Sequence, residues 1–195
     1  MRRFFPKAAF YFPDAPEELG FFGGYQWFSL DGYDPVVLQD PAAGKKYLDS
    51  LMPLAEIARG VTDPYMRAVL KHSGVSADKA ALCGFSQGGL MAVYTALRFP
   101  EKLAAAVGLS AVAVMFDGRT FSQDKIVSKP PVTLIHGDAD NVVPPAVFEL
   151  NKQNLKSAGV SVDGFVVPGL MHGIDETALR LSLIHISEPT RRVVI

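Results

Sequence analysis

Short apolar runs alternate along the chain with stretches in which apolar residues recur at helical spacing. Apolar runs of this length, bounded by turn residues, are typical of buried strands. The sequence predicts five such strands, at residues 8–12, 80–85, 104–109, 131–136 and 162–167. Strands that alternate with helices favour the α/β class, with a mostly parallel sheet and helices on both faces.

Four helical stretches are expected between and after these strands. The first covers residues 42–73, and we expect Pro53 and the stretch from Gly60 to Pro64 to interrupt it. The second follows residue 85 directly, the third runs from Pro144 or Pro145 to Ala158, and the last begins near Ile174. Residues 20–41 are rich in glycine, proline and aromatic residues, so we expect a long and functional loop there.

Length and charge exclude several classes of protein. The 195 residues correspond to one domain, and the single cysteine excludes an internal disulfide framework. A net charge of −1, from 19 basic and 20 acidic residues, gives no electrostatic case for nucleic acid or an anionic membrane. No apolar run reaches the ~18 residues of a membrane span. We therefore expect a soluble, cytoplasmic domain.

The segment Gly84-Phe85-Ser86-Gln87-Gly88 joins a predicted strand to a predicted helix. In that context a G-x-S-x-G string indicates a sharp turn that exposes the serine hydroxyl at a helix N-terminus. The residues two before and two after the serine approach each other, so we expect both to be small. The alternative is an ordinary glycine-rich turn.

A serine nucleophile needs a base, and His172, between two glycines after the fifth strand, is the best candidate. A solvated loop histidine is the alternative. His136 ends a buried strand and is expected to pack or to hydrogen-bond locally. Asp138 and Asp140 both follow the fourth strand, where catalytic groups gather in open α/β sheets. A metal site made of His136, Asp138 and Asp140 is a further alternative.

Three segments together resemble the phospholipase/carboxylesterase family of α/β-hydrolases, which includes the acyl-protein thioesterases. They are residues 84–89 (GFSQGG), 136–144 (HGDADNVVP) and 169–173 (GLMHG). Residues 13–16 and 25–30 are also similar to that family. The resemblance implies the α/β-hydrolase fold and hydrolysis of carboxylic esters or thioesters.

The resemblance also implies a role for four residues. Ser86 would be the nucleophile, His172 the base, and Asp140 rather than Asp138 the acid. The backbone N–H of Gln87 would be one donor to the oxyanion. No cofactor and no metal are implied. The expected partner is a small-molecule acyl ester or thioester, with no nucleic acid and no membrane span, and a homodimer is left open.

Apolar residues near the turn and near the histidine suggest a hydrophobic acyl pocket. Trp27, Phe85 and Met171 are the candidates for substrate binding, although such residues are as often simply part of a core. Three other hypotheses about the protein remain: a catalytically impaired fragment, a non-catalytic binding module, and a dienelactone-hydrolase-like enzyme. The last usually has cysteine as nucleophile, so Ser86 argues against it.

Members of this family begin with a strand pair and a His-Gly-x-Gly loop that supplies the second oxyanion donor. Residues 4–16 resemble the strand that follows that loop, so the resemblance implies a fold that lacks the first strands. Losing one such donor costs about 10²–10³ in rate, so we expect weak activity or none.

The last residues of the chain do not fit the same protein. Residues 181–191 (LSLIHISEPTR) read like a translation of a transposon-end adapter used in sequencing libraries, and Pro189 breaks the preceding helical pattern. We therefore expect residues 1–180 to form a partial hydrolase domain and residues 181–195 to be a non-native tail. A frayed native terminus is the alternative, and resequencing across the codon for Arg180 distinguishes the two.

Overall fold

The structure, a computed structural model, describes residues 8–20, 23–186 and 193–194. Its centre is a six-stranded sheet in the order β1-β8-β4-β5-β6-β7, and every pairing in it is parallel. The strands are β1 (Ala9–Phe10), β4 (Ala80–Phe85), β5 (Ala105–Leu109), β6 (Val132–Gly137), β7 (Val162–Val167) and β8 (Val193–Val194). The predicted α/β class with a parallel sheet is thereby confirmed.

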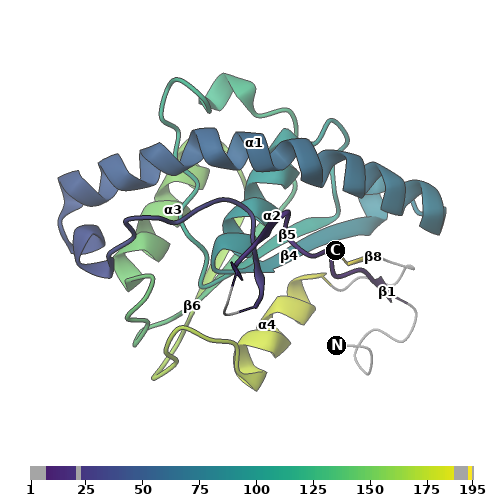
Figure 1. The fold of residues 1–195 in the computed structure, drawn as a ribbon. Coiled ribbons are helices and arrows are strands. Elements are labelled where there is room, and N and C mark those ends of the chain that lie inside the picture. The colour runs from purple at the N-terminus through teal and green to yellow at the C-terminus, as the bar shows by residue number, and fades with distance from the viewer. Residues whose placement is uncertain (1–7, 21–22, 187–192, 195) are drawn as a thin grey trace.

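Helices cover both faces of this sheet, as Figure 1 shows. The helices are α1 (Pro41–Ser73), α2 (Gln87–Arg98), α3 (Pro145–Ser157) and α4 (Glu176–Ile186). One apolar core lies under α1, α2 and α3, and a smaller one lies under α4. Because strand residues alternate between faces, Leu82 of β4 packs in the first core and Ala81 in the second.

Helix α1 is continuous over 33 residues, so the prediction that prolines interrupt it is wrong. Proline inside a helix costs about 3 kcal/mol, because it removes a hydrogen bond and crowds the preceding turn. Here the long buried face of α1 compensates for Pro53 and Pro64, since it packs on the core along most of its length. The Asp40 side chain caps the helix N-terminus, and Gly74 ends the helix with φ 66°.

The region expected as one long loop contains short elements. Within residues 20–41 lie the strand β3 (Tyr25–Gln26) and a 3₁₀ helix, η2 (Pro35–Gln39). Strand β3 forms an antiparallel pair with β2 (Glu17–Glu18), which lies just before that region. Two further 3₁₀ helices are η3 (Ala77–Lys79) and η4 (Gln123–Lys125). Strand β1 is shorter than predicted, and Phe12, which was expected in that strand, is 80% exposed.

The C-terminal region is described in two parts. Helix α4 continues to Ile186, and in β8 Val193 pairs with both Ala9 and Ala80. Residues 187–192 and 195 lie outside the described residues, so the non-native origin of residues 181–195 stays a prediction. Among the helices of the described ranges, none combines the length and hydropathy that crossing a membrane requires.

Candidate active site

The segment from Gly84 to Gly88 is the turn that joins β4 to α2. Ser86 lies at the junction with φ 54° and ψ −119°, a backbone conformation that L-residues rarely adopt. Its backbone N–H donates to the Leu109 carbonyl of β5 at 2.8 Å, which ties the turn to the neighbouring strand. Ser86 therefore lies at the carboxyl edge of the sheet and at the N-terminus of α2, where backbone N–H groups have no partner within the helix.

Two glycines make this turn sterically possible. A Cβ atom at Gly84 would lie 2.0 Å from the Gly88 carbonyl oxygen, and one at Gly89 would lie 2.7 Å from the Ala111 Cβ. Neither contact can be relieved by a flexible side chain, so both positions require glycine. A Cβ at Gly88 would meet Trp27 Nε1 at an ordinary 3.8 Å, so the expectation that residue 88 must be small is wrong.

Asp140 and His172 form a hydrogen-bonded pair at the same edge of the sheet. His172 Nδ1 lies 2.8 Å from Asp140 Oδ2, and the Asp140 residue is only 4% exposed. Burial raises the pKa of Asp140, but hydrogen bonds from His172 and from the N–H groups of Val143 and Val142 outweigh it and hold that pKa below its ordinary value. An ionised Asp140 accepts the Nδ1 proton, so Nε2 is the basic nitrogen of His172.

Asp138, the other acid that follows β6, has a different partner. Its Oδ1 accepts the Gly169 N–H at 2.6 Å, which ties the turn after β6 to the loop that carries His172. The two segments also meet through backbone, because a Cβ at Gly137 would lie 1.9 Å from the Leu170 carbonyl oxygen. The structure therefore puts Asp140 beside His172, and Asp138 against the loop that positions His172.

His136 is 2% exposed and forms the local hydrogen bond that the sequence predicts. Its Nε2 lies 2.8 Å from the Val143 carbonyl oxygen and 3.5 Å from Asp140 Oδ2. Because Asp138 bonds to Gly169 instead, the three residues considered for a metal site do not converge. Within the part of the chain that the structure describes, no group of three or more His, Cys, Asp or Glu side chains is arranged to hold a metal ion.

The side chain of Gln87 has a contact that the sequence did not predict. Its Oε1 accepts the backbone N–H of Trp27 at 2.9 Å, and its Nε2 donates to the Phe28 carbonyl at 2.8 Å. These two bonds hold the segment after β3 against the first turn of α2. Gln87 is the first residue of that helix and follows Ser86 directly.

A cavity of about 240 Å³ lies beside the turn, between residues 11–13, α1, β4 and α2. It is lined by Gly84 and Gly88 of the Ser86 turn and by mostly apolar side chains, among them Trp27, Met66 and Met91. Of the three residues predicted to bind substrate, Trp27 is in this lining. An apolar cavity beside the Ser86 turn suits a hydrocarbon group rather than a charged one.

Phe85 and Met171 lie outside the lining of that cavity. The Phe85 ring packs on the His172 ring, with 4.7 Å between centroids and 42° between planes. Met171 is 58% exposed. Cys83 does line the cavity, and burial raises the pKa of its thiol to about 12, so at neutral pH it carries almost no thiolate.

Serine, aspartate and histidine follow the parallel strands β4, β6 and β7 in that chain order, at one edge of the sheet. This is the order seen in α/β hydrolases, and the chain has the α/β-hydrolase fold. The model of the Phospholipase/Carboxylesterase family matches residues 2–188, so the chain belongs to that family of hydrolases. The resemblance seen in the sequence is thereby confirmed.

Individual relatives agree with this assignment. The chain is 32% identical over 184 residues to "Esterase YpfH" of Escherichia coli K12, covering 93% of this chain and 70% of that protein. It is 33% identical over 106 residues to "Acyl-protein thioesterase 1" of Neurospora crassa, covering 51% and 42% respectively. The crystal structure of esterase PE8 superposes with a TM-score of 0.73 at 32% identity, covering 88% of this chain and 74% of that one.

Proposed function

We propose that the chain is a serine hydrolase that cleaves carboxylic esters or thioesters through an acyl-enzyme. Ser86 is the nucleophile, His172 the general base and Asp140 the acid that orients it. The observation that carries the proposal is the 2.8 Å bond between His172 Nδ1 and the buried Asp140. The His172 ring also packs on Phe85, the residue before Ser86.

The proposed reaction proceeds in two halves. In the first, His172 Nε2 takes the Ser86 Oγ proton as Oγ attacks the acyl carbonyl, and the imidazolium is stabilised by Asp140. The oxyanion accepts a hydrogen bond from the backbone N–H of Gln87. His172 then gives its proton to the leaving alcohol or thiol. In the second half it activates a water that releases the acid from Ser86, and no cofactor takes part in either half.

The apolar cavity is the proposed site for the acyl chain. The cavity reaches the Ser86 turn at Gly84 and Gly88, so an acyl chain attached to Ser86 can extend along Trp27 and Met91. An added methylene in such a pocket is worth about 1–3 kcal/mol of discrimination. Phe85 then acts through His172, whose ring it contacts, rather than inside the cavity.

A fluorophosphonate probe tests the nucleophile directly, because it requires only an activated serine and not rapid turnover. We expect the probe to label the chain on Ser86 and the Ser86→Ala variant to lose both the label and any hydrolysis of p-nitrophenyl butyrate. Ser110→Ala is the matched control, since Ser110 also has a positive φ at a strand end but is 1% exposed.

Two results would contradict the proposal. Labelling that persists in Ser86→Ala would place the reactive group elsewhere. A folded chain that is neither labelled nor able to hydrolyse esters would favour a non-catalytic binding module.

A further inference from the structure

The turn from Asp140 to Val143 fixes the direction of the Asp140 carboxylate. Oδ1 accepts the backbone N–H groups of Val142 and Val143, at 2.9 and 2.8 Å, while Oδ2 faces His172 Nδ1. The Asp140 side chain is fully buried, so water cannot take over these bonds. Any movement of the two peptide groups therefore turns the oxygen that faces His172.

Tyr33 holds one of these peptide groups from outside the turn. Its hydroxyl donates to the Val142 carbonyl. That carbonyl and the N–H of Val143 belong to the same planar peptide unit. Tyr33 therefore binds one end of the unit whose other end binds Asp140 Oδ1, and so sets the orientation of that unit.

His136 holds the next peptide group. Its Nε2 lies 2.8 Å from the Val143 carbonyl, and because a carbonyl can only accept, Nε2 carries the proton. The same nitrogen is 3.5 Å from Asp140 Oδ2, and the ring packs on Phe148 with 5.7 Å between centroids. Burial lowers the pKa of His136, and the nearby His172 also lowers it. The Val143 carbonyl and Asp140 raise that pKa but do not outweigh burial. A neutral His136 is a fixed donor and not a second base.

We propose that Tyr33 and His136 are positioning residues that hold the Asp140 carboxylate in line with His172. Tyr33 comes from the segment before η2 and His136 from the end of β6, so the turn is fixed from two sides. Neither residue lines the cavity proposed for the acyl chain. What the aligned pair does rests on the proposed function, but the alignment itself is a property of the folded chain.

The test compares Tyr33→Phe and His136→Phe with Tyr47→Phe as the matched control. The Tyr47 ring contacts the Tyr33 ring, with 5.7 Å between centroids, but its buried hydroxyl has no hydrogen-bond partner among the described residues. Two quantities are measured: kcat and KM for p-nitrophenyl butyrate, and the low-field proton resonance of the His172 Nδ1–H. His136→Gln serves as the conservative variant, because an amide N–H can still reach a carbonyl.

We expect kcat to fall about tenfold in Tyr33→Phe and in His136→Phe while KM stays within about twofold, because only the catalytic geometry changes. The low-field resonance should broaden or disappear in both variants. Tyr47→Phe should match the parent chain in both measurements, and His136→Gln should recover part of kcat and of the resonance. A merely structural role would reduce the amount of folded protein without these changes.

The proposal is overturned if Tyr33→Phe keeps both kcat and the low-field resonance of the parent chain. It is also overturned if the parent chain shows no such resonance, since the Asp140–His172 bond would then be absent in solution. If His136→Phe does not fold, Tyr33→Phe still decides. A parent chain that shows the resonance but is neither labelled by the fluorophosphonate nor able to hydrolyse an ester contradicts the proposed function alone, and loss of the resonance in Tyr33→Phe still supports positioning.

Discussion

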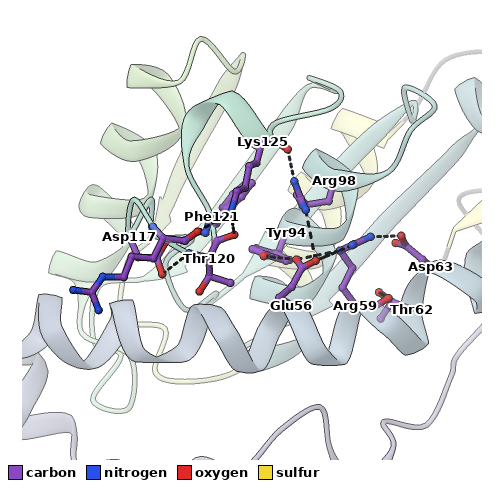
Figure 2. Close-up of polar contacts among 11 residues, drawn as sticks. Glu56, Arg59, Thr62, Asp63, Tyr94, Arg98, Asp117, Thr120, Phe121 and Lys125 are labelled. Atoms are coloured by element: carbon purple, nitrogen blue, oxygen red, sulfur yellow. Dashed lines mark hydrogen bonds and ion pairs between the residues drawn. The ribbon is translucent and has the colours of Figure 1, made fainter.

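Glu56 is at the centre of a polar network that joins α1 to α2, shown in Figure 2. Its Oε2 accepts the Tyr94 hydroxyl at 2.7 Å, and its Oε1 accepts Arg59 Nη2 at 2.8 Å, with Arg98 Nη2 at 3.5 Å. Tyr94 is completely buried. Arg98 also donates to the Lys125 carbonyl at 2.6 Å, so one carboxylate links two helices and the loop at η4.

Glu56→Gln removes the charge of this carboxylate and keeps its shape. Burial raises the pKa of Glu56, but hydrogen bonds from Arg59 and Tyr94 and the charges of Arg59 and Arg98 outweigh it and lower that pKa from 4.5 to about 2. Such a difference corresponds to about 3.4 kcal/mol at neutral pH. Because the Glu56 side chain is 30% exposed, screening by solvent reduces that figure. We expect Glu56→Gln to lower the free energy of unfolding by about 2 kcal/mol.

The sign of the pH dependence follows from the lowered pKa. A carboxylate whose pKa is lower in the folded chain stabilises the fold above its unfolded pKa and loses that effect as pH falls through the folded value. The difference between the parent chain and Glu56→Gln should therefore be complete above about pH 5 and roughly halved near pH 3. Urea unfolding followed by circular dichroism, at a series of pH values, measures this difference.

Glu149→Gln is the matched control, because Glu149 pairs with Lys152 three residues away but is 51% exposed. Exposed pairs of this kind contribute about 0.2–1 kcal/mol. If Glu56→Gln lowers the free energy of unfolding by no more than Glu149→Gln does, the Glu56 carboxylate does not stabilise the fold as inferred. That inference is also refuted if the cost of Glu56→Gln does not shrink as the pH is lowered.

Two further predictions concern the close backbone contacts of the site. Gly84→Ala should lower the free energy of unfolding by about 3 kcal/mol, because its Cβ would lie 2.0 Å from the Gly88 carbonyl oxygen. Gly88→Ala should lower it by less than about 1 kcal/mol, because its Cβ would lie 3.8 Å from Trp27 Nε1. Equal losses for the two variants in urea unfolding would contradict this prediction. Gly137→Ala would place its Cβ 1.9 Å from the Leu170 carbonyl and displace the His172 loop, so kcat for p-nitrophenyl butyrate should fall about a hundredfold in the folded variant. A change of less than about threefold would show that the loop absorbs the shift without moving His172.

Strands β4 to β7 of the central sheet could be predicted from the sequence because turn residues bound their short apolar runs, and β5 and β6 are buried along their whole length. Residues 80–85 and 162–167 are strands β4 and β7 with the predicted bounds. The continuity of helix α1 was harder to predict, since Pro53 and Pro64 are strong local signals against a continuous helix. The packing that outweighs these prolines involves α2 and the loops, which lie far away in the sequence. The β2–β3 pair was missed because two-residue strands have too little pattern to be recognised.

The candidate site could be predicted only in part. Ser86 and His172 stand out in the sequence because glycines surround them, but Asp138 and Asp140 have the same local pattern. The family resemblance implied Asp140 rather than Asp138, and the fold shows that Asp140 meets His172 while Asp138 meets Gly169. The contacts of Gln87 and Tyr33 join segments 60 and 109 residues apart in the chain, and no local pattern marks them.

The site separates into positions that set its geometry and positions that shape what it binds. Backbone meets backbone where Gly84 approaches Gly88 and where Gly137 approaches Leu170, so the Ser86 turn and the His172 loop are held by contacts that leave no room for a side chain. The cavity, in contrast, is lined by flexible or apolar side chains such as Met66 and Met91, which tolerate changes of size. Substitutions of side chains such as Met66 and Met91 should therefore alter acyl-chain preference with the Asp140–His172 pair intact, whereas substitutions at Gly84 or Gly137 should impair hydrolysis of every ester alike.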